Sequence, residues 1–134
     1  MSKRKPEFRI RHYGVYSQWD SKSKDLPKFV KLTTQIPAEI DIEFGFIANI
    51  KWAKNQELYY CIDHPGILDA EGNRRPPFDG TVFIKTNDWD FYLGDTIWEP
   101  LSDKLGNWQL TLELAGKVIA DKTFEVFTEN GSGD

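Results

Sequence analysis

Apolar and polar residues alternate along much of this 134-residue chain. Every even-numbered position from Ile40 to Trp52 is apolar, whereas a helix would need apolar residues three and four positions apart. Such alternation sends one set of side chains to a core and the other to water, so the pattern predicts a long strand over residues 39–52. Gly45, in the middle of this run, predicts a bulge or a close approach by another backbone.

The same alternation predicts seven further strands, separated by turn residues such as Pro27, Pro37 and Gly66. These strands cover residues 7–19, 28–35, 57–63, 80–86, 90–98, 107–115 and 117–127. No segment keeps a helical apolar stripe over three turns. Seven to eight strands at this spacing indicate an all-β fold, an antiparallel two-sheet sandwich. A barrel with a similar number of strands is the alternative.

The clearest local pattern is a hairpin near the end of the chain. Trp108 and the three leucines that follow it at every second position share one face, and Ala115-Gly116 is typical of the turn. The returning strand changes parity between Ile119 and Phe124. If both residues face the core, this change requires a bulge near Asp121-Lys122.

Length and composition are those of one globular domain. Hydrophobic residues make up 40% of the chain and charged residues 28%, a composition that excludes a disordered chain. The sequence also lacks an apolar run long enough for a membrane-spanning helix. We place the core at residues 7–127 of a single domain, 1–134, and expect a disordered tail over 128–134. The aromatic residues assigned to the core are Trp108, Phe44, Phe46, Phe124 and Trp98.

Charge is distributed unevenly along the chain. Of the 17 basic and 21 acidic residues, nine basic and three acidic ones fall within residues 1–31, so the rest of the chain is strongly acidic. Basic and apolar residues alternate in Phe8-Arg9-Ile10-Arg11, which is typical of an exposed edge strand. A nucleic-acid-binding arm is the alternative, and the acidic body argues against it because it would repel phosphates. We expect neither a nucleic-acid nor a membrane partner.

The number of cysteines and the N-terminal sequence indicate in which cellular compartment the protein is expected. The single cysteine, Cys61, excludes an internal disulfide and is compatible with a reducing compartment. The first residues lack the apolar stretch of a signal peptide. We therefore expect a cytoplasmic protein, or a periplasmic one if a leader has been removed.

A series of short motifs resembles one protein family. In chain order they are Ile36-Pro37-Ala38, Phe44-Gly45-Phe46, His64-Pro65-Gly66, Trp98-Glu99-Pro100, and Gly106-x-Trp108 leading to Gly116-Lys117-x-Ile119-Ala120-x-x-x-Phe124-x-Val126. This pattern, over about residues 10–127, resembles a bacterial family known only as a domain of unknown function (DUF3859-like). The resemblance implies an immunoglobulin-like β-sandwich and brings no catalytic residues. The loop at 99–106 is longer than the family pattern.

Residues able to carry out catalysis are few. Cys61 and His64 are three positions apart, which places them on opposite faces of a strand. The isolated glycines form no phosphate-binding loop. The carboxylates within residues 88–99 lack the spacing of a calcium loop, so solvated turn residues are the preferred interpretation and a calcium site is the alternative. We predict a protein that is not an enzyme and that uses no metal or cofactor.

Aromatic residues are the best candidates for binding. They make up 14% of the chain, and several fall where a strand ends or turns. With a turn expected at Gly94-Asp95, Trp89 and Tyr92 are predicted to lie on an exposed rim lined by carboxylates. The candidate binding residues are Trp89, Tyr92, Asp88, Asp90, Asp95, Trp19 and Trp52. The competing interpretation is that these rings only cap the ends of the core.

These observations favour a non-enzymatic protein-interaction module that acts through loops or a sheet edge. The basic residues 1–31 and the acidic residues 79–103 would let two copies associate, so the expected partner is either a second copy or another protein. The alternative function is a carbohydrate-binding accessory module, in which a glycan stacks on Trp or Tyr while carboxylates accept its hydroxyls.

Overall fold

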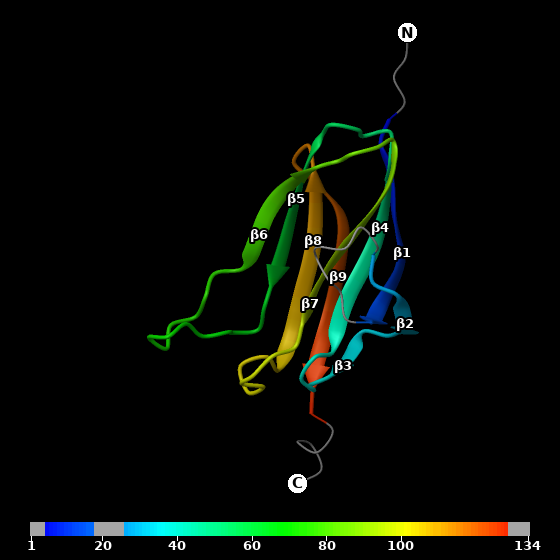
Figure 1. Ribbon diagram of the computed structural model, residues 1–134. Coiled ribbons are helices and arrows are strands. Elements are labelled where there is room, and N and C mark those ends of the chain that lie inside the picture. The colour runs from blue at the N-terminus through cyan, green and yellow to red at the C-terminus, as the bar shows by residue number, and fades with distance from the viewer. Residues whose placement is uncertain (1–4, 18–25, 129–134) are drawn as a thin grey trace.

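Nine β-strands make up the part of the chain that the computed structural model describes, residues 5–17 and 26–128 (Figure 1). These ranges contain no helix, and hence none long and apolar enough to cross a membrane. The strands are β1 (Glu7–Tyr16), β2 (Phe29–Leu32), β3 (Gln35–Pro37), β4 (Glu43–Lys51), β5 (Glu57–Asp63), β6 (Phe78–Phe83), β7 (Asp88–Thr96), β8 (Gly106–Leu114) and β9 (Lys117–Phe127).

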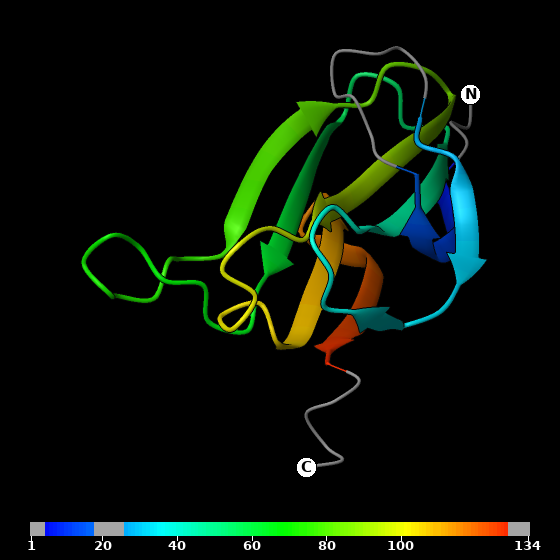
Figure 2. The same ribbon diagram turned by 60° about the horizontal axis from the view of Figure 1, so that its bottom comes forward.

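The strands form two sheets that face each other (Figure 1, Figure 2). Sheet A has the order β2-β1-β4-β7, and sheet B has the order β3-β9-β8-β5-β6. Neighbouring strands are antiparallel except β3 and β9, which run parallel. The predicted all-β, two-sheet sandwich is thus confirmed, with nine described strands in place of seven to eight.

The additional strand arises because residues 28–35 do not form one strand. β2 pairs with β1 in sheet A, whereas β3 pairs with β9 in sheet B. Between them the backbone N–H of Gln35 donates to Oγ1 of Thr33 at 2.9 Å, a local turn that competes with the strand ladder. The chain therefore crosses from one sheet to the other. β2 pairs only with residues 14–16 of β1, so among the described strands residues 8–11 lie against β4 alone, as predicted for an edge strand. β2 continues this edge of sheet A beside the end of β1.

The core lies between the sheets and is built from alternate residues of each strand. In β4, the even-numbered residues of 44–50 are at most 1% exposed, as the alternation predicts. The Phe44 ring contacts the rings of Trp108 and Phe124 in sheet B, with ring centroids 5.3 and 5.5 Å apart. Four of the five predicted core aromatics are confirmed. Trp98 is wrong as a core residue: it follows β7, outside the sheet, and is 37% exposed.

β8 and β9 form the predicted hairpin. Leu114 pairs with Lys117, so Ala115 and Gly116 are a two-residue turn, and both have positive φ angles of 53° and 80°. This turn matches the twist of a hairpin but strains a residue with a Cβ atom such as Ala115. The expected bulge is present and lies nearer to the turn than predicted, at Ile119.

A loop of residues 64–77 projects from one end of the sandwich (Figure 2). His64, expected in a turn, begins this loop and is 2% exposed. The backbone N–H of Ile67 donates to its Nδ1 at 2.9 Å, so the proton is on Nε2, which donates to the carbonyl of Pro76 at 3.2 Å. The imidazole therefore joins the two ends of the loop.

Candidate functional site

The candidate site begins on the side of sheet A that faces away from sheet B. This outer face consists of the odd-numbered residues of β4 and the residues paired with them on β1 and β7. The alternation assigns these residues to water, but Glu43, Ile47 and Asn49 are at most 5% exposed. Both faces of β4 are buried because Tyr16 and Tyr92 pack with Ile47 in a separate cluster on the outer face.

A row of glycines permits close contacts across sheet A. Gly14, Gly45 and Gly94 are paired across β1, β4 and β7. A Cβ atom at Gly45 would lie 2.1 Å from the carbonyl oxygen of Leu93, and one at Gly94 would lie 2.1 Å from the hydroxyl oxygen of Tyr92. The predicted close backbone approach at Gly45 is therefore confirmed.

The outer-face rings extend to the edge strand β2. Tyr16 and Tyr92 meet edge to face with ring centroids 5.1 Å apart, and Tyr16 also meets Phe29 of β2 at 5.6 Å. His12 stacks on Phe29 with centroids 4.5 Å apart. Burial and the Arg11 guanidinium lower the pKa of His12, which favours a neutral imidazole in this stack. The result is a continuous aromatic surface from β7 to β2.

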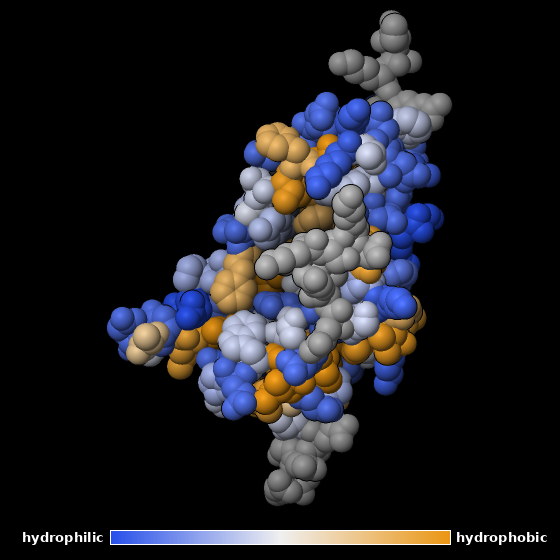
Figure 3. Space-filling view, in the orientation of Figure 1, coloured by the Kyte–Doolittle hydropathy of each residue, from blue (hydrophilic) through white to orange (hydrophobic). Residues whose placement is uncertain are grey.

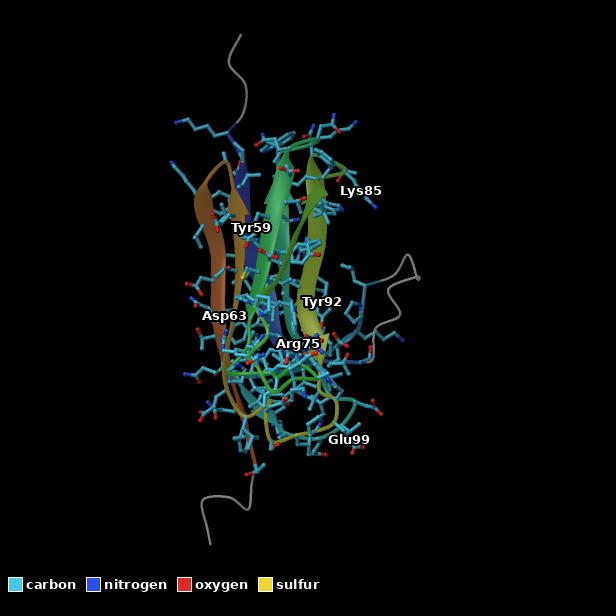
Figure 4. All side chains as sticks on the ribbon, turned by 90° about the vertical axis from the view of Figure 1, so that its left-hand side faces the viewer. Tyr59, Asp63, Arg75, Lys85, Tyr92 and Glu99 are labelled. Carbon is cyan, nitrogen blue, oxygen red and sulfur yellow. The ribbon has the colours of Figure 1, made fainter. Side chains whose placement is uncertain are left out.

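Glu43 is a buried carboxylate bound by two hydroxyl groups. The Tyr92 hydroxyl donates to Oε2, and the Thr96 hydroxyl donates to Oε1 at 2.5 Å. Burial and the Glu43 carboxylate raise the pKa of Tyr92, so the phenol remains a donor. Tyr92 lies along β7 between Lys85 at one end of the sandwich and Glu99 at the other (Figure 4). It is 3% exposed and its hydroxyl is used inside the fold.

Asp88 and Asp90 share a partner on the outer face. The Asn49 side-chain amide donates to one carboxylate oxygen of each, at 2.8 Å in both cases. Arg11 donates to Asp90 at 2.9 Å, and the side chains of this pair are 41% and 35% exposed, so its contribution is at most about 1 kcal/mol. The pair joins the basic N-terminal strand to the acidic β7 within one chain.

Trp89 and Tyr92 do not form the predicted shared rim. Trp89 pairs with Ile50 on the core side of sheet A, whereas Tyr92 is on the outer face, because the two residues are an odd number of positions apart. The expected turn at Gly94-Asp95 is wrong, since β7 runs unbroken from residue 88 to 96. A single aromatic platform with adjacent carboxylates is therefore not formed by these residues.

The other predicted residues are dispersed. Asp95 is half-buried opposite Phe44, and burial raises its pKa to about 6. Trp52 is half-buried after β4, where its backbone N–H donates to the carbonyl of Asn87 at 2.9 Å. Trp19 lies outside the described residues.

The feature that sequence reasoning missed is the exposure of β2. All four of its residues are exposed, with Phe29 at 40%, Val30 at 63% and Leu32 at 61%. Hydrophobic colour gathers at this edge of the molecule, on the right in Figure 3 where Figure 1 places β2. The apolar run was visible in the sequence, but its assignment to one strand over 28–35 concealed the free edge.

The reactive side chains are separated. Cys61 lies in the middle of β5, between Asp79 and Thr111 of the neighbouring strands, and burial raises the pKa of its thiol. His64 is engaged with backbone groups of its own loop. Within residues 5–17 and 26–128, no three or more His, Cys, Asp or Glu side chains gather as a metal site would require. Along β2, sheet A has exposed apolar side chains, backbone hydrogen-bonding groups and one lysine, Lys31.

Comparison with known proteins gives the family. Residues 4–126 match the family described as a domain of unknown function (DUF3859). An immunoglobulin-like protein from Pseudomonas aeruginosa has a similar structure, with a TM-score of 0.70 and 23% identity over 90% of this chain and 97% of that chain. A second match is an alkylpurine DNA glycosylase from Pseudomonas fluorescens bound to DNA containing an abasic site analog. It has a TM-score of 0.44 and 12% identity over 90% of this chain and 30% of that chain, and this TM-score is too low to support an argument. Among curated proteins there is no significant match. The chain thus belongs to the DUF3859 family, and its fold is an immunoglobulin-like β-sandwich.

Proposed function

We propose that this domain is a non-enzymatic protein-interaction module that binds an extended segment of a partner protein along the free edge of β2. The observation that carries the proposal is an edge strand with all four residues exposed, three of them apolar. Edge strands present unpaired backbone groups, and proteins usually protect them with charges, prolines or a covering segment. An apolar free edge is a template for β-strand addition.

Strand addition at β2 would use two kinds of contact. The backbone groups of β2 that point away from β1 would bond to the partner, at about 0.5–1.5 kcal/mol net for each hydrogen bond. Phe29 and Leu32 are paired with Tyr16 and Gly14, so they continue the aromatic outer face toward the partner. Because β2 has only four residues, we expect a dissociation constant on the order of micromolar.

The other expected functions have less support. Association of two copies through residues 1–31 and 79–103 would use charges of which Arg11 and Asp90 are already paired within the chain. A glycan platform needs an exposed ring beside carboxylates, whereas Tyr92 is buried and Trp89 packs on the core side. Within residues 5–17 and 26–128, no strand pairs with the side of β2 that faces away from β1.

The proposal is tested by selecting ligands from a displayed library of random ten-residue peptides. Recovered peptides should bind the native domain and lose at least about tenfold in affinity for Val30→Glu, which places a charge on the exposed edge. Val118→Glu is the matched control, because Val118 is an apolar residue of similar exposure, 59%, on β9. Amide resonances of residues 28–32 should shift when peptide is added. Failure to recover any peptide, or equal binding to both variants, would overturn the proposal.

A further inference from the structure

We infer that the segment bound at β2 is acidic, with carboxylate side chains alternating with apolar ones; this inference rests on the proposed function and names the chemistry of its partner. Lys31 lies within β2, and the exposed Lys28 directly precedes the strand. Residues 26–32 contain these two lysines and no acidic residue. This edge of sheet A is thus basic in a chain whose net charge is −4.

The register of β2 determines where a carboxylate would be placed. Phe29 and Leu32 are paired with residues of β1 that lie on the outer face. Lys31 is paired with Val15, which is paired in turn with the core residue Phe44 of β4. The register shift at Val30 puts Phe29 on the same side of the strand as Leu32, and ordinary alternation puts Lys31 on the opposite side. An added strand would set apolar side chains beside Phe29 and Leu32, and the intervening side chain beside Lys31. A carboxylate is the group that complements this lysine.

The rest of the surface would direct such a segment to this edge. The opposite sheet ends at β6, whose exposed face carries Asp79 next to Cys61 and Tyr59 of β5. Like charges repel across an interface, so an acidic segment is disfavoured at β6 and favoured at β2. The two edge strands β2 and β6 thus have opposite charge preferences.

A second copy of the chain fits the β2 edge less well. Antiparallel pairing of two β2 strands through all four residues would set Lys31 of one copy diagonally next to Lys28 of the other, and like charges in this position are destabilising. β7 is acidic, but it lies at the other edge of the same sheet, so pairing β2 with β7 would be head-to-tail and would form a ring or a filament. Asp88 and Asp90 are also bound by Asn49. The geometry therefore favours a separate acidic partner.

The test uses three end-blocked, dye-labelled peptides of eight residues in which Val alternates with Glu, Gln or Lys. Fluorescence anisotropy should show the Glu peptide binding about tenfold more tightly than the Gln peptide, with the Lys peptide weakest. The preference should decline between 50 and 500 mM salt. Lys31→Glu should reverse the order of the Glu and Lys peptides. Lys117→Glu, which changes another exposed lysine next to the β8–β9 turn, should leave the order unchanged.

The outcomes separate this inference from the proposed function. If the Gln or Lys peptide binds as tightly as the Glu peptide, and Val30→Glu still abolishes binding, the acidic partner is wrong and the interaction module stands. If no peptide binding depends on Val30, both are wrong. Sedimentation of the domain alone tests whether two copies associate. A mass that rises with concentration would indicate association of copies. If Val30→Glu restores the mass of one copy and Val118→Glu does not, the partner at β2 is a second copy and the separate partner is wrong.

Discussion

Asp95 should lower the stability of the domain at neutral pH, and Asp95→Asn should relieve this effect. The carboxyl group is half-buried opposite Phe44, and the backbone N–H of Thr96 donates to its Oδ1 at 2.8 Å. Burial, assisted by the nearby Glu43 carboxylate and opposed by Lys104, raises its pKa from 3.8 to about 6. Asparagine has nearly the same shape and keeps the acceptor oxygen, so this substitution removes the charge alone.

The two pKa values determine the sign and size of the effect. The carboxyl ionises near pH 3.8 in the unfolded chain and near pH 6 in the folded one, so the folded state holds the proton more tightly. Its contribution to stability is complete below pH 3.8 and is lost as the pH rises through 6. At about 1.36 kcal/mol for each pH unit, the difference corresponds to about 3 kcal/mol. Asp95→Asn should therefore be the more stable protein by up to about 3 kcal/mol at pH 7.5, with little difference at pH 4.

Urea unfolding of both proteins between pH 4 and 8, followed by tryptophan fluorescence, measures this difference directly. Subtracting the two free energies of unfolding at each pH cancels the groups that titrate equally in both proteins. A carbon-13 NMR titration of the Asp95 carboxyl gives the folded-state pKa independently. If the difference does not change with pH, or if the asparagine variant is less stable at pH 7.5, the argument from burial is wrong.

Trp108→Ala should lower the free energy of unfolding in urea by about 3–5 kcal/mol, because the ring is fully buried and its Nε1–H donates to the Lys104 carbonyl at 2.9 Å. A loss below about 1 kcal/mol would contradict its core position. Ala115→Asn should raise the free energy of unfolding by about 1 kcal/mol, since Asn tolerates the positive φ of this turn better than Ala; an unchanged or lower thermal midpoint would argue against strain there. Cys61 should react slowly with a thiol reagent at neutral pH because burial raises its pKa, and complete labelling within seconds would show the thiol to be activated.

Features encoded within a few neighbouring residues could be predicted from the sequence. The parity of Phe44 to Ile50 identified the core face of β4, and the leucines after Trp108 identified that of β8. A two-residue turn at Ala115-Gly116 followed from its flanking alternation. The bulge in β9 was expected because Ile119 and Phe124 differ in parity, and Ile119 is itself the unpaired residue, while Ala120, Phe124 and Val126 are buried. Its position differed because the parity change could be accommodated at more than one place.

Strand order depends on contacts that alternation does not encode. Residues 28–35 are suitable for a strand throughout, and only their pairing shows that β2 belongs to sheet A and β3 to sheet B. The basic and apolar alternation of 8–11 correctly indicated an edge, because β2 pairs only with residues 14–16 of β1. The alternation did not reveal that residues 28–35 contribute β2 to the same edge of sheet A.

The outer face of sheet A could not be predicted because its members are far apart in the sequence. Gly14, Gly45 and Gly94 make one row only after three strands have paired. In that row Gly94 makes room for the Tyr92 ring, and Gly14 and Gly45 make room for neighbouring backbone. Once the Tyr16 and Tyr92 rings cover the face, residues on both sides of β4 are buried. Tyr92 is buried in this cluster and stabilises the fold, so an abundance of aromatic residues did not by itself indicate an exposed binding platform.

The folded arrangement also changes which charges remain available for a partner. In the sequence, the basic N-terminal segment and the acidic residues 79–103 look equally able to attract another molecule. In the structure Asp88 and Asp90 accept hydrogen bonds from Asn49, and Asp90 also from Arg11. Intramolecular pairing thus reduces the attraction that the acidic strand β7 can exert, while the exposed Lys31 remains beside an unpaired strand edge. The charge that remains available to a partner is therefore mainly basic, and Lys31 carries it at the strand edge where a partner strand can be added.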